Sequence, residues 1–75
     1  MMIRNLKTGV YQHYKGQKYL VLALAKHSES LEELVVYVSL YENPECQVWV
    51  RPAKMFFEDV EFEGKLVPRF RLVGE

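Results

Sequence analysis

Short runs of β-branched, aromatic and leucine residues, separated by turns that contain glycine or proline, fill most of the 75-residue chain. Such residues favour the pleated surface of a strand, and glycine can take the positive φ that a tight turn needs. The pattern predicts strands over residues 10–14, 19–27, 34–41, 47–51, 60–62 and 66–70. No linker interrupts the sequence. The chain is therefore predicted to be one mostly β domain over residues 1–75, with its core within residues 9–70.

The longest strand segment, residues 19–27, is apolar on both alternating faces over most of its length. A strand that crosses the middle of a small barrel has this character. Pro52 can occupy the first position of a helix, so one or two helical turns are predicted over residues 52–58, burying Met55 and either Phe56 or Phe57. The predicted fold is a small SH3-like barrel of five or six strands, closed at one end by this helical turn.

The carboxyl-terminal part is predicted to form a last hairpin. Glu63-Gly64-Lys65 is a glycine-centred turn between the segments 60–62 and 66–70. Pro68 cannot donate a ladder hydrogen bond, so it requires an edge position or a bulge. The tail after Arg71 is expected to fray.

Residues 42–46 are predicted to form a hairpin loop between segments 34–41 and 47–51, because Asn-Pro favours turning. Direct pairing across this loop places Leu40 opposite Val48 and Val38 opposite Val50, an apolar face suited to the core. The other face then carries the polar and aromatic side chains of both strands: Tyr37, Ser39, Tyr41, Gln47, Trp49 and Arg51. A slip of one residue would exchange the two faces.

The formal net charge is zero, which excludes strong nonspecific binding to duplex DNA but leaves selective or single-stranded binding open. Cys46 is the only cysteine, so an intrachain disulfide and a multi-cysteine zinc site are excluded, and a reducing compartment suits the chain. No segment approaches the roughly 18 apolar residues of a membrane span, and the first residues lack a signal peptide's apolar run. A cytoplasmic location without membrane contact is expected.

Several short motifs follow one another in order: Gly9-Val10-Tyr11, His13-Tyr14-Lys15-Gly16, Ala25-Lys26-His27-Ser28-Glu29, Val35-Val36-Tyr37, Leu40-Tyr41, Trp49-Val50-Arg51-Pro52, Met55-Phe56 and Val67-Pro68-Arg69-Phe70. Together they resemble the bacterial domain-of-unknown-function family 1653, over residues 9–70. The resemblance implies a small bacterial protein with an SH3-like barrel. It provides no catalytic residues to transfer to this chain.

The aromatic and basic residues are the best candidates for a ligand site. They are Tyr37, Tyr41, Trp49 and Arg51 on one predicted face, with Tyr11, His13, Lys15 and Arg69 adjoining. Aromatic rings with interleaved cations stack nucleobases and hold peptides or small ring compounds. The alternative is plain packing, in which the rings cover the core with their polar tips in water and Arg51 pairs with a carboxylate.

His27 is a second candidate, as a base or an anion contact at a strand end. The alternative is a structural histidine, with turn and cap roles for Ser28 and Glu29. A metal site built from His13, His27 and Glu29 would need the strands to align, and neither a metal nor a cofactor is predicted. Cys46 has acidic neighbours, which raise a thiol pKa, so a nucleophilic role is not expected.

These features predict a non-enzymatic recognition module that binds a nucleic acid segment, a nucleotide or a protein segment across the Trp49 and Arg51 face. One alternative is a small enzyme or ligand-processing domain with His27, Glu29 and Arg51 at a pocket. Another is a structural subunit of a larger complex, which predicts an exposed apolar patch larger than a typical monomer shows. A core this small contributes little stability, so a homodimer is also open.

Overall fold

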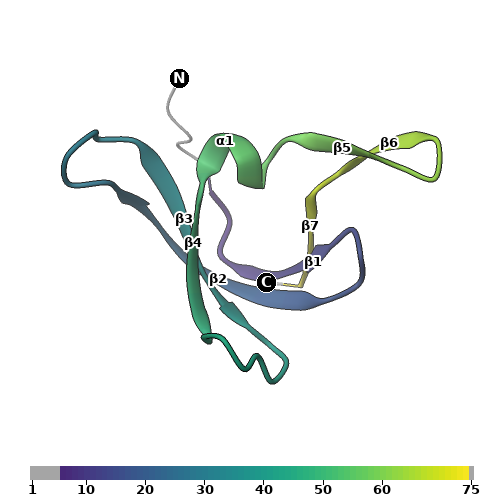
Figure 1. The fold of residues 1–75 in the computed structure, drawn as a ribbon, viewed down its shortest axis with the longest axis horizontal. Coiled ribbons are helices and arrows are strands. Elements are labelled where there is room, and N and C mark those ends of the chain that lie inside the picture. Colours follow the sequence, from purple (N-terminus) through teal and green to yellow (C-terminus); the bar gives the residue numbers. More distant parts are fainter. Residues whose placement is uncertain (1–5, 75) are drawn as a thin grey trace.

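The computed structural model describes residues 6–74, which form seven strands and one short helix. The elements are β1 (Gly9–His13), β2 (Lys18–Lys26), β3 (Glu33–Ser39), β4 (Val48–Pro52), α1 (Ala53–Phe56), β5 (Asp59–Phe62), β6 (Lys65–Pro68) and β7 (Phe70–Gly74). Five strands form an antiparallel sheet in the order β4-β3-β2-β1-β7, and β5 and β6 form a separate hairpin (Figure 1). The prediction of a mostly β domain is confirmed. Within the described residues, no helix has the length and apolar character to cross a membrane.

The five-stranded sheet is open. Strands β4 and β7 are its two edges, and no ladder joins them within residues 6–74, so the closed barrel expected from the sequence is not detected. The tail that was expected to fray after Arg71 is strand β7, which pairs with β1 so that Gly74 lies opposite Val10. The predicted strand 66–70 is divided at Arg69, because β6 turns back on β5 while β7 joins the main sheet.

The β5–β6 hairpin extends away from the main sheet (Figure 1). Glu63 and Gly64 both have positive φ angles, 53° and 79°, which is the conformation of a tight hairpin turn. Pro68 lies opposite Asp59 in this two-stranded ribbon, so its position beside a free edge agrees with the expectation for a proline in a strand.

The predicted helical turn is present and supplies the centre of the core. Pro52 precedes its first residue, and the buried members are Ala53 and Phe56, whereas Met55 and Phe57 stay more than a third exposed. The Phe56 ring stacks on Phe70 of β7, with ring centroids 4.1 Å apart and the planes within 3°. We call the face of the sheet that packs on these rings the inner face; its buried hydrophobic residues are Tyr11, Val21, Val35 and Tyr37.

The β3–β4 register differs from the predicted one by two residues. Val38 lies opposite Val48, Val36 opposite Val50 and Tyr37 opposite Trp49. The predicted division of residues into two faces survives, because a shift of two preserves the alternation. The prediction of which face is buried is wrong: Val48 and Val50 are 52% and 58% exposed, and Tyr37 is only 5% exposed.

The loop between β3 and β4 explains the shifted register. The backbone N–H of Ser39 donates to the carbonyl of Gln47 at 2.8 Å, so the loop closes two residues earlier in β3 than direct pairing from Tyr41 would allow. The side chain of Gln47 donates to the carbonyls of Ser39 and Tyr41 and accepts the backbone N–H of Asn43. These bonds satisfy the backbone of a wider loop than the sequence predicted.

Candidate functional site

Six residues line a pocket of about 220 Å³ at the inner face: Tyr19, Tyr37, Tyr41, Asn43, Trp49 and Arg51. We call it the inner pocket. The ladder explains why strands β2, β3 and β4 contribute side chains to one place, because Tyr37 lies opposite both Val21 and Trp49. Four of the six residues, Tyr37, Tyr41, Trp49 and Arg51, are those that the sequence placed on one face.

Tyr19 and Asn43 were missed by sequence reasoning. The Tyr19 hydroxyl lies 2.9 Å from that of Tyr41, and the Asn43 amide donates to the same Tyr41 hydroxyl at 3.3 Å. Alternation along β2 could have placed Tyr19 on the same side as Val21, but only the register with β3 brings it beside Tyr37. Asn43 had been assigned a turn role, and the loop conformation that aims its side chain at the pocket has no signal in the sequence.

Hydrogen bonds fix the orientation of the rings in the inner pocket. The Trp49 indole N–H donates to Oγ of Ser39 at 3.1 Å, and Ser39 is itself buried. The Tyr19 ring contacts those of Tyr37 and Tyr41 edge to face, with centroids 5.2 and 5.6 Å apart. Ring walls held in this way are already ordered before a partner arrives, which lowers the entropy lost on binding.

Arg51 brings a positive charge to the inner pocket. Its Nε donates to the Tyr37 hydroxyl at 3.3 Å, and its guanidinium carbon lies 5.6 Å from the Phe70 ring centroid. Within residues 6–74 Arg51 forms no ion pair. The suggestion that Arg51 pairs with a carboxylate is therefore wrong for the described part of the chain. A guanidinium has five N–H donors, so most of them remain available to an anion.

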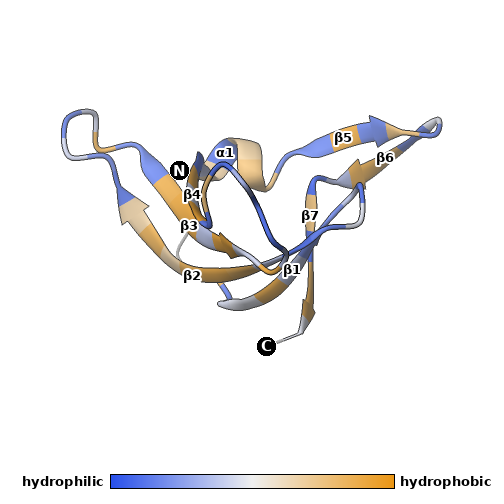
Figure 2. Ribbon diagram, turned by 60° about the horizontal axis from the view of Figure 1, so that its bottom comes forward, coloured by the Kyte–Doolittle hydropathy of each residue, from blue (hydrophilic) through white to orange (hydrophobic). Residues whose placement is uncertain are grey.

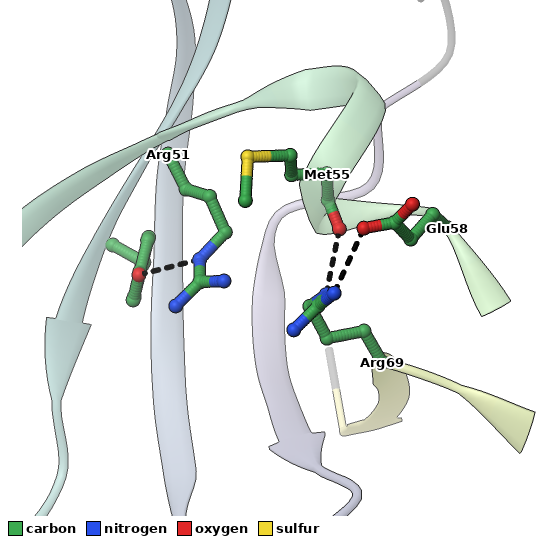
Figure 3. Close-up of polar contacts among 5 residues, drawn as sticks. Arg51, Met55, Glu58 and Arg69 are labelled. Carbon is green, nitrogen blue, oxygen red and sulfur yellow. Dashed lines mark hydrogen bonds and ion pairs between the residues drawn. The ribbon is translucent and has the colours of Figure 1, made fainter. Parts of the chain in front are cut away.

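Arg69 has the opposite environment. Its Nη2 donates to Glu58 at 2.8 Å and its Nε donates to the Met55 carbonyl at 3.0 Å, which ties the base of the β5–β6 hairpin to the end of α1. Figure 3 shows Arg69 reaching these two acceptors while Arg51 bonds elsewhere. Arg69 therefore has a structural position, and it does not line the inner pocket.

The Tyr19 hydroxyl remains protonated at neutral pH. Burial, and then the hydrogen bond with Tyr41, raise the pKa of Tyr19 above its ordinary value of 10.0. None of the lining residues carries a carboxylate. The pocket therefore offers hydroxyl, amide and guanidinium donors with a net positive charge, which is the lining that an oxyanion requires.

Tyr11 and His13 do not line the inner pocket, although both were expected to adjoin it. Tyr11 is buried in the core and its hydroxyl donates to the Lys7 carbonyl at 2.8 Å. The His13 ring packs edge to face on Phe70 with centroids 4.9 Å apart. Tyr11 thus has the packing role that was the alternative for this set of residues.

His27, Glu29 and Arg51 are not brought together. His27 follows β2 and its Nδ1 accepts the backbone N–H groups of Glu29 and Ser30, at 3.1 and 3.3 Å, so it caps the β2–β3 turn. Neither His27 nor Glu29 lines the inner pocket, which contains Arg51. His13 lies near the other end of β2, and the described residues contain no group of three side chains that could hold a metal ion.

A second depression of about 400 Å³ lies between the β5–β6 hairpin and the β1–β2 turn. Its lining residues are Gln12, His13, Tyr14, Gly16, Phe62, Val67, Pro68 and Arg71. Of these residues only His13 was a predicted site residue. The others could not be predicted to lie together, because the position of the β5–β6 hairpin depends on the break between β6 and β7 at Arg69. This depression contains fewer ring walls and no guanidinium that is held by a tyrosine hydroxyl, so the inner pocket is the better candidate site.

His13 gives the fold a testable pH dependence. Its partial burial, and then the positive charges of Arg51, Arg69 and Lys15, hold its pKa below the ordinary value of 6.5. The unfolded chain therefore binds a proton at a higher pH than the folded chain, so this contribution to stability is complete above pH 6.5 and falls as the pH drops toward the folded pKa.

We expect His13→Asn to weaken this pH dependence. Asparagine can still accept the Lys15 backbone N–H that His13 Nδ1 accepts at 3.1 Å, but it cannot be protonated. The measurement is urea unfolding of both proteins at about pH 7.5 and about pH 5.5. An equal loss of stability in the two proteins on acidification would contradict the role of His13.

Comparison with known proteins agrees with the motif order. The family model described as protein of unknown function (DUF1653) matches residues 9–72. The crystal structure of a DUF1653 protein from Bordetella bronchiseptica is similar to this chain, with 38% sequence identity, a TM-score of 0.89 and coverage of 93% of this chain and 90% of that one. No curated protein matches. The resemblance inferred from the motifs is confirmed, and the chain belongs to the DUF1653 family.

Proposed function

We propose that the chain is a non-enzymatic recognition module that binds single-stranded nucleic acid at the inner pocket. One observation carries the proposal: the Arg51 guanidinium forms no ion pair within the described residues and lies in a pocket walled by tyrosine and tryptophan rings. A single-stranded segment supplies both complements, a negative phosphate for the arginine and an unstacked base for the rings.

The size of the inner pocket limits what it holds. Pockets for whole small-molecule ligands and cofactors usually span roughly 300–1,000 Å³, and this one measures about 220 Å³. It therefore suits one group of a longer partner, such as one base or one phosphate, rather than a complete cofactor. The rest of the strand would run over neighbouring surface.

The chain's charge favours single strands over a duplex. Its net charge is zero, and duplex binding relies on many phosphate contacts with a steep salt dependence. Binding to a single strand draws a larger share of its energy from stacking, at about 1–3 kcal/mol per base. The alternative partners are a free nucleotide and an acidic protein segment, since each also brings an anionic group to Arg51.

The ionisable groups in the inner pocket support binding over catalysis. A general base needs a pKa near the working pH, whereas burial moves the pKa of Tyr19 upward, away from neutrality. A guanidinium group is always charged in proteins, so an arginine offers no proton for transfer at neutral pH. The pocket thus offers fixed donors and ring faces, and these features serve recognition.

The test is an NMR titration of isotope-labelled protein with a mixed-sequence single-stranded RNA, at low and at physiological salt. We expect saturable shifts at the Trp49 indole N–H and around Arg51 that persist at physiological salt. We expect Arg51→Ala to weaken binding by roughly 30-fold or more, because truncating one partner of a desolvated charge contact costs about 2–5 kcal/mol and each 1.4 kcal/mol corresponds to about tenfold. We expect the fold to be retained.

Arg71→Ala is the matched control, because Arg71 is an exposed arginine that lines the other depression. It removes the same charge and should leave binding almost unchanged. Arg51→Lys should give intermediate affinity, since lysine keeps the charge but loses the planar fork. Equal losses in Arg51→Ala and Arg71→Ala would show that binding depends on overall charge and not on the inner pocket. Shifts induced by an acidic peptide, with none from RNA, would show that the inner pocket binds a protein segment and not nucleic acid.

A further inference from the structure

Polar groups are concentrated at the inner pocket. Strands β2 and β3 are apolar along much of their length (Figure 2), whereas the pocket that they help to line is formed by hydroxyl, amide, indole and guanidinium side chains. The hydrogen bonds among these side chains show which of their donors and acceptors are already used. The groups that remain define what the pocket can bind.

The surplus groups are donors. Figure 3 shows the single bond of Arg51 beginning at Nε, and among the described residues its two terminal nitrogens have no hydrogen-bond partner. The Tyr37 hydroxyl accepts that bond at 3.3 Å, so its own proton is left to donate. Tyr19 and Tyr41 share one hydroxyl–hydroxyl bond of 2.9 Å, which uses the proton of one and leaves that of the other.

The acceptors, by contrast, are largely used. Oδ1 of Asn43 accepts the backbone N–H of Glu45 at 3.0 Å, and the Asn43 amide donates to the Tyr41 hydroxyl at 3.3 Å. The Trp49 indole N–H donates to Oγ of Ser39 at 3.1 Å. A ligand group that must donate finds few free acceptors in the inner pocket, whereas a group that only accepts meets several donors.

A phosphate matches this lining better than a base edge does. The Watson–Crick edge of every base combines donors with acceptors, so a base would leave its own N–H groups without partners. Phosphate oxygens only accept, and the arginine fork suits them. A terminal phosphate monoester has three accepting oxygens and a charge of about −1.5 to −2 at pH 7, whereas a phosphate inside a strand is a diester with a single charge. The donors and the charge of the pocket therefore match the end of a strand best.

The charges around the inner pocket also favour a strand end. A phosphate inside a strand continues on both sides, so the strand would have to leave the pocket in two directions. The β3–β4 loop forms one wall and carries the exposed acids Glu42 and Glu45, which would repel a strand that crossed it. A strand that ends in the pocket avoids this loop and can leave toward β1, where Arg51 and Lys15 place positive charge around His13.

We propose that the inner pocket is an end-recognition site, which holds the terminal phosphate monoester of a single-stranded nucleic acid. The inference rests on the proposed function and deepens it, because it assigns the phosphate and not a base to the pocket. Arg51 and the Tyr37 hydroxyl donate to the phosphate oxygens, and the first base stacks on Tyr41, the exposed ring of the pocket. The volume of about 220 Å³ accommodates one such group.

The test compares one short RNA sequence in three forms: with a 5′-phosphate, with a 3′-phosphate and with hydroxyl groups at both ends. Trp49 is the sole tryptophan of the chain, so its indole N–H gives a single NMR signal that reports binding at the pocket. We expect one phosphorylated form to bind about tenfold more tightly than the hydroxyl form, or better, at physiological salt. The two phosphorylated forms distinguish a 5′ end from a 3′ end.

Tyr37→Phe removes one donor and keeps the ring. We expect it to reduce the preference for the phosphorylated end by about tenfold, while RNA with hydroxyl ends binds almost as before. Tyr14→Phe is the matched control, because it deletes the hydroxyl of another half-buried or buried tyrosine that lies in the β1–β2 turn, outside the inner pocket. The preference should persist in that variant. Tyr41→Phe, which should also reduce the preference, replaces Tyr37→Phe if the latter loses its dispersed spectrum.

The outcomes separate the end-recognition site from the proposed function. Equal binding of the three RNA forms would overturn end recognition and leave single-strand binding in place, whereas a lack of binding by all three would overturn both. A nucleoside monophosphate that binds as tightly as the phosphorylated RNA would assign the inner pocket to a free nucleotide and overturn the strand end. Equal losses of the preference in Tyr37→Phe and Tyr14→Phe would show that the phosphate binds elsewhere.

Discussion

Replacing Phe56 by alanine is expected to remove about 3–5 kcal/mol from the free energy of unfolding. Phe56 is fully buried, stacks on Phe70 at 4.1 Å and contacts the rings of Tyr11 and Tyr37 at centroid distances of 5.5 and 5.6 Å. A 75-residue chain is expected to have a total stability of roughly 4–11 kcal/mol. One substitution thus removes a large share of it, and the variant should populate the unfolded state measurably without denaturant.

Phe57→Ala is the matched control for Phe56→Ala. It deletes the same ring from the adjacent residue, but Phe57 is 37% exposed and lies at the end of α1. We expect a loss of about 1 kcal/mol or less. Urea unfolding followed by circular dichroism measures both. Similar losses in the two variants would mean that the ring stack over the sheet is not the centre of the core.

The order of secondary structure elements could be predicted from the sequence because each depends on local residues. The strand segments, the helical turn after Pro52 and the Glu63-Gly64 turn all follow from β-branched residues, proline and glycine at short range. The division at Arg69 could not be predicted in this way. It depends on β7 pairing with β1, and a contact between the two ends of the chain has no local signal.

The choice of the buried face could not be made from hydrophobicity alone. Both faces of the β3–β4 ladder are rich in apolar side chains. The face with Val36, Val38, Val48 and Val50 is the more hydrophobic, so hydrophobicity favours it as the core. The structure instead buries Tyr37 and Ser39, because Phe56 and Phe70 pack against that side and fill it with large rings. Buried hydroxyls on this face find hydrogen-bond partners in Trp49 and Arg51, which removes the penalty for burying them.

Most residues of the candidate site could be predicted to share one face, because a register shift of two residues preserves the alternation of side chains between the two faces of a strand. Tyr37, Trp49 and Arg51 stay on one face in either register. The prediction that they face solvent was partly wrong, since Tyr37 is buried while Tyr41 is exposed. The inner pocket forms at this boundary, where the core rings end and the β3–β4 loop begins.

The second prediction with a large expected effect compares two valines that lie on opposite faces of the sheet, Val35 and Val48. Val35→Lys should abolish the fold, whereas Val48→Lys should be tolerated in dilute solution. Val35 is fully buried on the inner face opposite Arg51, and Val48 is 52% exposed on the other face. A lysine at Val35 would lose the burial of an apolar side chain and place a second positive charge beside the arginine, a combined loss of roughly 4 kcal/mol or more.

A lysine at Val48 extends into water from an edge strand, so we expect a change of about 0.5 kcal/mol. Dispersion of the amide NMR spectrum and urea unfolding at micromolar concentration distinguish the two outcomes. The comparison also separates the two possible cores, because a core built on the valine face would reverse the result. Loss of the fold in Val48→Lys, with a folded Val35→Lys, would show that the rings of Tyr37 and Phe56 do not pack on the face that carries Val35.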